Sequence, residues 1–155
     1  MSKIILPEGF RNFLVKAKRH TYASPVNNEV KLEDGSKRLT FSEGSLVYID
    51  TYYGFNPFIG QELVLLQNKP IWGMNYSGEI VSPNLKSEEV YAFLKEALGQ
   101  VSVTFPFRGP QQYQNRNFRY INQLEGAVEI FSGTEQILFN DRQVYILHYH
   151  GGLIN

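Results

Sequence analysis

The chain of 155 residues contains no cysteine, and this absence excludes several kinds of site at once. Without thiols there is no disulfide framework, no cysteine nucleophile and no zinc–thiolate centre. A chain that uses no disulfides fits a reducing compartment, and we predict a cytoplasmic location. The sequence also lacks the ~20 consecutive apolar residues of a membrane helix and the apolar core of a signal peptide, so no membrane association is expected.

An excess of either charge is also missing, because 15 basic residues balance 15 acidic ones. A neutral chain lacks the broad positive surface with which proteins hold nucleic acids, so direct nucleic-acid binding is not expected. Basic residues gather only near the N-terminus, and we predict that they form the solvent-exposed face of a helix. They are Arg11, Lys16, Lys18, Arg19 and His20.

The common signatures of catalytic and nucleotide-binding sites are absent too. The sequence has no G-x-S-x-G, H-E-x-x-H, P-loop or G-x-G-x-x-G motif. Serine nucleophiles and nucleotide cofactors therefore have no support, and no cofactor is predicted. The enzyme alternative that remains is acid–base or metal chemistry by carboxylates and histidines.

The chain is rich in aromatic side chains, which make up 14% of its residues, and it contains an internal similarity. FIGQELVLLQNKPIWGMNYSG (58–78) aligns without a gap on FSGTEQILFNDRQVYILHYHG (131–151). Phe, Gly and Glu recur in both segments in the order F-x-G-x-E, and weaker similarity continues upstream. We therefore predict a tandem duplication, with one repeat at about 10–80 and the other at about 87–154.

Each repeat has the pattern of one helix followed by four antiparallel strands. Apolar residues at helical spacing predict helices at about 10–19 and 88–98. Half a sheet with one helix leaves too much apolar surface exposed at ~70 residues, so the repeats should pack together with pseudo-twofold symmetry. The expected product is a single α+β domain spanning residues 1–155. Its hairpin turns are predicted at Glu43-Gly44, Asn68-Lys69, Asn115–Asn117 and Asp141-Arg142.

Each copy of the central hairpin carries one acidic residue among apolar neighbours. With a two-residue loop at 68–69, Glu62 faces Asn75 in the first copy, and Glu135 faces His148 in the second. Both faces of these strands are largely apolar, which predicts strands covered on both sides. A carboxylate in such surroundings needs a partner. Either each Glu accepts hydrogen bonds from nearby backbone or from Asn75 and His148, or the two line one cleft between the repeats.

The second copy adds two histidines that share one face of a strand. His148 and His150 would join Glu135 in a set of two histidines and one carboxylate, which is a recognised metal geometry. Their counterparts in the first copy, Asn75 and Ser77, are weak ligands. Core or edge histidines without a metal are the alternative, and no metal is predicted.

Two further features hold chemically useful side chains. Arg108 precedes a rigid Gly-Pro turn, where it would bind a carboxylate or phosphate of a ligand, or pair with an acidic residue of the other repeat. Asp50, Tyr52 and Tyr53 form an acid-and-aromatic cluster in YIDTYYG. That cluster fits the rim of a ligand site and a tyrosine-rich surface hairpin equally well.

The succession YIDTYYG, FIGQE, KPIWGMNYSG, FLKEAL, PFRGP, FSGTE and HYHGGLI resembles an uncharacterised bacterial domain family. Its members occur alone or joined behind an XRE-type helix-turn-helix in transcription regulators, and the resemblance extends from Phe13 to Ile154. It implies a sensor or interaction module. This chain begins at the domain itself, without a helix-turn-helix ahead of it, so direct DNA binding is not expected here.

The leading prediction is a domain that binds a small molecule or a protein partner in the cleft between the repeats, linked to transcriptional regulation. Two alternatives stay open. One is an enzyme that uses a carboxylate and histidines in that cleft, with or without a metal. The other is a structural or homo-oligomerising module. The candidate ligand-binding residues are Asp50, Tyr53, Glu62, Trp72, Asn75, Tyr76, Arg108, Glu135, His148, Tyr149 and His150.

Overall fold

A computed structural model describes residues 4–26 and 28–155 of the chain. In these ranges the chain forms two helices, α1 (Phe10–His20) and α2 (Ser87–Leu98), and nine strands. The strands are β1 (Val30–Lys31), β2 (Lys37–Glu43), β3 (Leu46–Gly54), β4 (Phe58–Leu66), β5 (Lys69–Ile80), β6 (Gln112–Asn115), β7 (Phe118–Ala127), β8 (Ile130–Phe139) and β9 (Arg142–Leu153).

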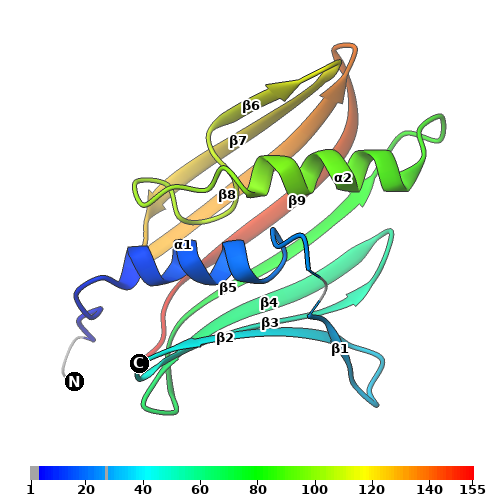
Figure 1. Ribbon diagram of the computed structural model, residues 1–155. Coiled ribbons are helices and arrows are strands. Elements are labelled where there is room, and N and C mark those ends of the chain that lie inside the picture. The colour runs from blue at the N-terminus through cyan, green and yellow to red at the C-terminus, as the bar shows by residue number, and fades with distance from the viewer. Residues whose placement is uncertain (1–3, 27) are drawn as a thin grey trace.

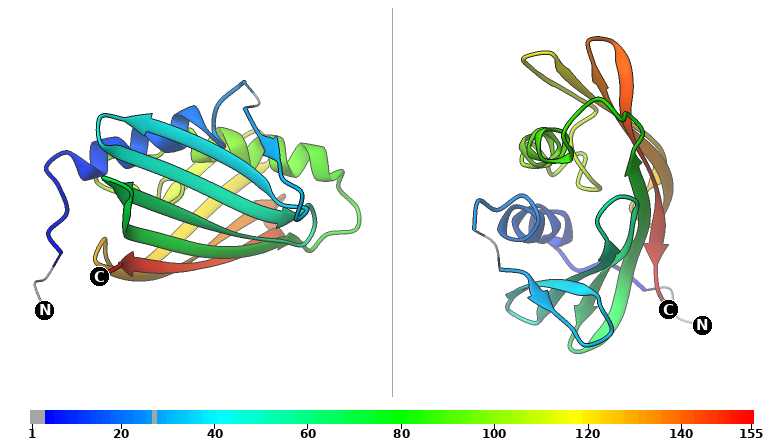
Figure 2. Two further views of the ribbon diagram at one scale, coloured as in Figure 1. Left: turned by 90° about the horizontal axis from the view of Figure 1, so that it is seen from below. Right: turned by 90° about the vertical axis from the view of Figure 1, so that its right-hand side faces the viewer.

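All nine strands join one antiparallel sheet in the order β1-β2-β3-β4-β5-β9-β8-β7-β6. β5 and β9 lie side by side in the middle, and the sheet extends from them to the short edge strands β1 and β6 (Figure 1). The sheet is curved, and both helices lie on its concave side (Figure 2). The molecule is therefore two layers thick, with the helices on one face of the sheet.

Both helices form where the sequence predicts them, because each turns one apolar stripe towards the sheet. α1 buries Phe10, Phe13 and Leu14, and α2 buries Val90 and Phe93 along with further residues of its stripe. Two acidic residues in the first turn of α2 stabilise its positive end. In the described ranges, neither helix has the length and apolar character needed to cross a membrane.

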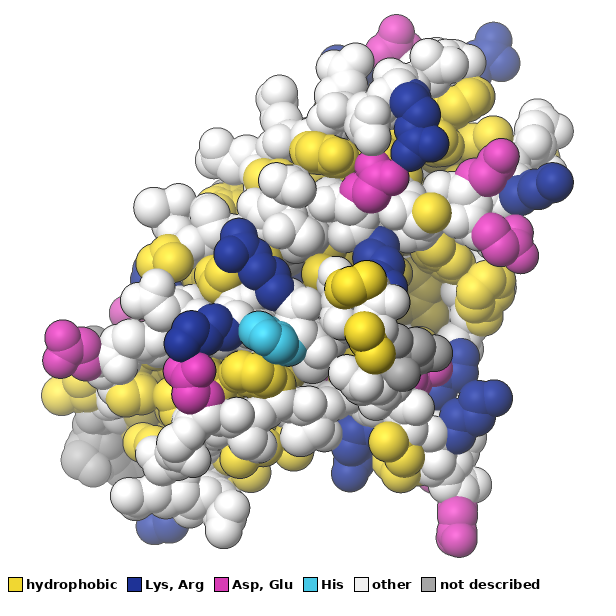
Figure 3. Space-filling model, in the orientation of Figure 1, with side chains coloured by type: hydrophobic (Ala, Val, Ile, Leu, Met, Phe, Trp, Pro, Cys, Tyr) yellow, Lys and Arg dark blue, Asp and Glu magenta, His cyan; other side chains and the backbone are white. Residues whose placement is uncertain are grey.

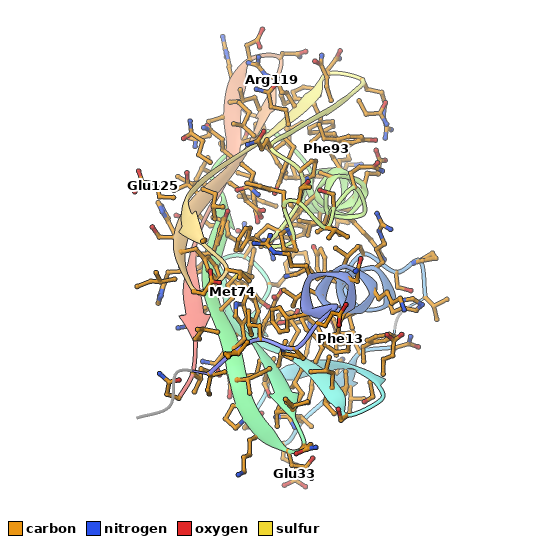
Figure 4. The ribbon with its side chains drawn as sticks, turned by 90° about the vertical axis from the view of Figure 1, so that its left-hand side faces the viewer. Phe13, Glu33, Met74, Phe93, Arg119 and Glu125 are labelled. Atoms are coloured by element: carbon orange, nitrogen blue, oxygen red, sulfur yellow. The ribbon has the colours of Figure 1, made fainter. Side chains whose placement is uncertain are left out.

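The core lies between the helices and the concave face of the sheet. Phe13 from α1, Phe93 from α2 and Met74 from β5 lie in this layer (Figure 4). Trp72 is fully buried and stacks on Phe131 of the other half of the sheet, with ring centroids 5.7 Å apart. Burial of these large side chains is the main favourable term that holds the helices on the sheet.

The two central hairpins turn one residue earlier than the sequence predicts. Gln67 and Asn68 have φ angles of 50° and 64°, and Asn140 and Asp141 have φ angles of 48° and 64° in the second hairpin. Two successive residues with positive φ are typical of a type I′ turn, whose twist suits a tight two-residue hairpin.

A bulge follows each turn and shifts the register again. On β5 the pairing skips Ile71, so that Glu62 lies opposite Met74, and β9 is shifted in the same way against β8. The predicted pairing of Glu62 with Asn75 is therefore wrong. A register change of one residue moves a side chain to the other face of the sheet, so this correction decides which residues can meet.

Only the concave face of the sheet is covered by helices, in contrast to the prediction that the central strands are covered on both sides. Along β5, Trp72, Met74 and Tyr76 are buried, whereas Asn75 between them is exposed. Glu125 of β7 points away from the helices on the convex side (Figure 4). The described part of the chain leaves the convex face open to solvent.

The mixed α+β class expected from the sequence is confirmed, with one difference in the strands. β1 is an additional short strand at one edge, so the first half of the chain contributes five strands and the second half four. The halves meet where β5 pairs with β9, with Tyr76 opposite Tyr149. The duplication and its pseudo-twofold symmetry stay predictions.

Candidate functional site

A pocket of about 400 Å³ opens on the concave side, between the end of α1, the strands β2–β4 and α2. Its mouth is the recess with hydrophobic side chains to the right of the centre in Figure 3. Sites for small molecules usually have volumes of ~300–1,000 Å³. Three buried residues of its lining, Asp50, Tyr76 and Arg108, form what we call the floor. The aromatic wall consists of Tyr22, Tyr52, Phe55, Phe58, Tyr76 and Tyr91.

Tyr76 on β5 reaches Asp50 on β3 across the strand between them. Its hydroxyl donates a hydrogen bond of 2.6 Å to Asp50 Oδ1. The residue opposite Tyr76 on β4 is Gly60, and a Cβ at that position would overlap the tyrosine ring. The glycine of the F-x-G-x-E motif is therefore the residue that lets the tyrosine cross the sheet.

The second half of the sheet contains the same arrangement with one chemical change. Tyr149 on β9 crosses Gly133 on β8 and donates a hydrogen bond of 2.7 Å to Asn122 Oδ1 on β7. A neutral amide thus occupies the position that an acid holds in the first half. The pocket borders the acid and not the amide.

Asp50 is the titratable group of the floor. Its pKa is raised to about 7, chiefly by burial and next by the negative charge of Glu62. The hydrogen bond from Tyr76 and the positive charges of Arg108 and Lys18 oppose this rise. Asp50 therefore exchanges its proton near neutral pH at a position that borders the pocket.

Arg108 is held in the floor by Glu135. Its Nη2 and Nε donate hydrogen bonds of 2.6 and 3.1 Å to the two carboxylate oxygens, and Tyr120 and Tyr145 donate to the same carboxylate at 2.6 and 2.8 Å. The guanidinium lies 5.3 Å from the centroid of the Tyr76 ring. The acidic partner of Arg108 therefore comes from its own half of the chain, and the predicted partner from the other half is wrong.

Glu62 pairs with Lys18 of α1 at 2.6 Å, and the same ammonium donates to the Phe107 carbonyl oxygen at 2.6 Å. Lys18 is only 7% exposed, so the prediction that it belongs to a solvent-exposed basic face is wrong. Lys18 follows Leu14 by four residues and so continues the buried stripe of the helix. That spacing is the signal by which the sequence could have identified it.

The two glutamates thus have other partners than those expected from the sequence. Each is bound to one buried cation, and Glu135 is fully buried behind Arg108 and borders no open space of the pocket. Their presence in both hairpins serves packing, because each ion pair joins a helix or loop to the sheet beneath it.

The two histidines of β9 lie on the opposite face of the sheet from Glu135. Alternation along β9 buries Leu147 and Tyr149 and exposes His148 and His150 on the convex side, and Glu135 lies opposite Leu147. The predicted pairing of Glu135 with His148 and the candidate metal set are therefore wrong. Within residues 4–26 and 28–155, no group of three His, Cys, Asp or Glu side chains is placed to hold a metal ion.

The remaining candidates lie away from the pocket. Tyr53 is exposed and donates to Asp34 at 2.7 Å, Asn75 is exposed on the convex face, and Trp72 is a core residue that donates to a backbone carbonyl. Of the residues predicted from the sequence, the pocket brings together Asp50, Tyr76 and Arg108, with Glu62 and Glu135 supporting them.

Most of the aromatic wall is missed by sequence reasoning. Tyr91 comes from α2 and meets Phe55 edge-on, with ring centroids 5.1 Å apart. Tyr52 donates to Glu29, and the Lys37 ammonium lies 5.5 Å from its ring centroid. No sequence pattern links these separate elements. Within YIDTYYG, Tyr52 could have been chosen over Tyr53 as the site residue, because it lies two residues after Asp50 and so shares its strand face.

Comparison with known proteins adds a family without an assigned activity. The family described as Domain of unknown function (DUF5680) matches residues 50–154. No curated protein and no solved structure matches the chain. The matched range contains the floor of the pocket and the whole second half of the sheet, whereas α1, β1 and β2 precede it.

Proposed function

The chain belongs to the family Domain of unknown function (DUF5680), and we propose that it is a small-molecule-binding domain whose ligand site is the pocket on the concave face. The observation that carries this proposal is the pocket itself. It combines an aromatic wall with a few buried polar groups, which is the usual composition of a ligand site. A purely structural module would need no such opening.

The floor supports the proposal because it is organised before any ligand arrives. Arg108 is fixed by two hydrogen bonds from its guanidinium to one carboxylate, and Asp50 is fixed by Tyr76. Polar groups held in this way lose little conformational freedom on binding, so more of the interaction energy remains as affinity.

The resemblance to domains that follow a helix-turn-helix supports a sensor role. We propose that occupation of the pocket is the signal, and that a protein partner or a second copy of the chain responds to it. A bacterial, cytoplasmic regulator is the setting that this proposal implies.

The similarity between the halves also belongs to the proposal. We propose that they are repeats of one ancestral unit. The pairing of Trp72 with Leu153, Tyr76 with Tyr149 and Ile80 with Tyr145 supports this, because positions 73 residues apart exchange places about the central pair. An acid at the position of the tyrosine's partner occurs in only one repeat, Asp50 against Asn122, and this difference fits specialisation after duplication.

A thermal-shift screen of small metabolites tests the binding function. Ligands of the pocket should raise the melting temperature of the wild type, because a ligand that binds only the folded state stabilises it. Ala92 borders the pocket on α2, so Ala92→Trp should abolish these shifts by filling the mouth. Ala127→Trp, at the exposed end of β7, is the matched control and should keep them. Shifts of equal size in all three proteins, or no shift in any, would contradict the proposal.

Acid–base catalysis by Asp50 is a second candidate, favoured by its pKa of about 7 in a pocket. It replaces the carboxylate–histidine site considered from the sequence. A ligand found by the screen would then be chemically changed on incubation, as followed by mass spectrometry, and Asp50→Asn would stop the change. A ligand recovered intact would leave binding as the function.

A further inference from the structure

The buried charges beneath the helices form closed pairs, with one exception. Lys18 pairs with Glu62, and Arg108 pairs with Glu135, both at 2.6 Å. Asp50 is 4% exposed and accepts a hydrogen bond from Tyr76, but no described Lys or Arg lies within ion-pair distance of it. One buried carboxylate therefore borders the pocket without a directly paired cation.

The other half of the sheet indicates that this charge is not needed for the fold. Asn122 accepts the equivalent hydrogen bond from Tyr149 with a neutral amide. Burial of a carboxylate costs more free energy than burial of an amide with the same partner. Since an amide can accept the tyrosine's hydrogen bond, the fold does not explain a carboxylate at position 50. The pocket beside Asp50 offers a functional explanation.

The surroundings of Asp50 suit a positively charged ligand. Aromatic faces attract organic cations, and the aromatic wall supplies six rings within the pocket. Three cationic side chains also line the pocket. Two of them have an acidic partner: Glu135 for Arg108, and Glu29 for Lys37 at 3.8 Å. The third, Lys95, lies on α2 and shares the lining with Glu88 of the same helix. The charges of Arg108 and Lys37 are therefore largely offset by paired carboxylates, whereas Asp50 has no directly paired cation among the described residues.

We infer that the pocket takes an organic cation, a small molecule in which an ammonium, amidinium or guanidinium group is joined to an apolar body. The cationic group pairs with the carboxylate of Asp50, and the body lies against the aromatic wall. This inference rests on the proposed binding function and narrows its ligand to one chemical class.

Three probes that share a ring and differ in charge test the inference: benzylamine, benzyl alcohol and benzoate. They are titrated into the ¹⁵N-labelled protein at pH 8, where Asp50 is ionised and benzylamine is still cationic, and binding is followed by amide shifts around the pocket. Benzylamine should bind with a Kd at least tenfold lower than that of benzyl alcohol, and benzoate should bind most weakly.

Two variants assign the preference to Asp50. Asp50→Asn should raise the Kd of benzylamine about tenfold, to the level of benzyl alcohol. Glu125→Gln removes the same charge from the convex side and should leave the Kd unchanged (Figure 4). The comparison of the three probes on the wild type does not depend on whether either variant folds.

The outcomes separate this inference from the function on which it rests. Benzyl alcohol or benzoate binding in the pocket as tightly as benzylamine would overturn the preference for a cation and leave the binding function standing. Benzylamine binding that is unchanged in Asp50→Asn would also overturn it. Absence of pocket shifts with all three probes would count against both.

Discussion

At the scale of single residues, Asp50 distinguishes one half of the sheet from the other. Both halves contain a tyrosine that crosses a glycine to reach a polar residue on the next strand but one. In the first half that residue is an acid beside a pocket, and in the second it is Asn122 in the packed interior. Burial of the Asp50 carboxylate therefore lowers the stability of the folded state, and burial of the Asn122 amide does not carry this cost.

Replacement of Asp50 by Asn should stabilise the protein more at pH 8 than at pH 5. Asp50 keeps its proton up to a pKa of about 7 when folded but loses it near 3.8 when unfolded, so the folded state binds more protons between these values. The free energy of unfolding of the wild type therefore falls as pH rises through this window. From pH 5 to 8 the free energy of unfolding of the wild type falls by about 3 kcal/mol through this group, and the variant lacks this loss.

Urea denaturation of both proteins at the two pH values measures this difference. The same stability gap between variant and wild type at pH 5 and at pH 8 would contradict an elevated pKa at position 50.

Gly60→Ala should destabilise the protein by about 2 kcal/mol, because the new methyl group overlaps the Tyr76 ring. In a Tyr76→Leu background the same change should cost much less, since the ring that it strikes is gone. Thermal denaturation of the two single variants and the double variant completes the cycle. If the stability effects of Gly60→Ala and Tyr76→Leu add in the double variant, Gly60 is needed for a reason other than space for the Tyr76 ring.

At the scale of elements, α1 is joined to the sheet by a buried ion pair as well as by apolar packing. Lys18 connects the helix to Glu62 on β4 and to the carbonyl group of Phe107 before β6. One side chain thus links three segments that are distant in the sequence. Lys16, two residues earlier, makes an ion pair with Glu43 that is half exposed.

Lys18→Met should destabilise the protein by about 3 kcal/mol, because it leaves Glu62 buried without a counter-charge. Lys16→Met is the matched control on the same helix and should cost less than ~1 kcal/mol, since its pair is solvated. Adding Glu62→Leu to Lys18→Met should recover most of the loss. Equal costs for the two lysines, measured by chemical denaturation, would refute the role given to Lys18.

The elements also indicate what the sequence can and cannot predict. Apolar spacing predicts both helices, and the turn sequences predict the hairpins, because these signals are local. The register of the central hairpins is not predicted, because each hairpin contains a bulge, at Ile71 in the first, and the neighbouring sequence gives no signal for it. That one error places Glu62 on the wrong face and suggests a histidine site that does not form. Arg108 is found because it precedes a rigid Gly-Pro turn, and Asp50 because it belongs to the cluster YIDTYYG; both signals are local in the sequence.

At the scale of the whole molecule, the continuous sheet joins the two halves through β5 and β9. Each of these strands has a neighbour on both sides, whereas β1 and β6 are short edges. The halves also share the core, since Trp72 stacks on Phe131 across the centre. Separation of the halves would therefore expose both a sheet edge and a large apolar surface.

Backbone amide exchange should accordingly report one cooperative unit. Amides of β5 and β9 should exchange only through global unfolding, with the same free energy on both sides of the centre, and those of β1 and β6 should exchange fastest. Exchange measured by NMR over hours at several urea concentrations provides the test. Two separate groups of slow amides, one from each half, would instead identify independently unfolding units.

The two ends of the pocket differ in how firmly their side chains are held. Asp50 and Arg108 are less than a tenth exposed and are fixed by hydrogen bonds, whereas Val26 and Phe55 at the mouth are 60% and 57% exposed. Side chains that packing does not confine adapt to different ligand shapes at little cost, but two charged groups held in fixed positions do not. Such a site selects its ligands by one functional group and accepts variation in the rest of the ligand. It would bind a series of compounds that share a head group.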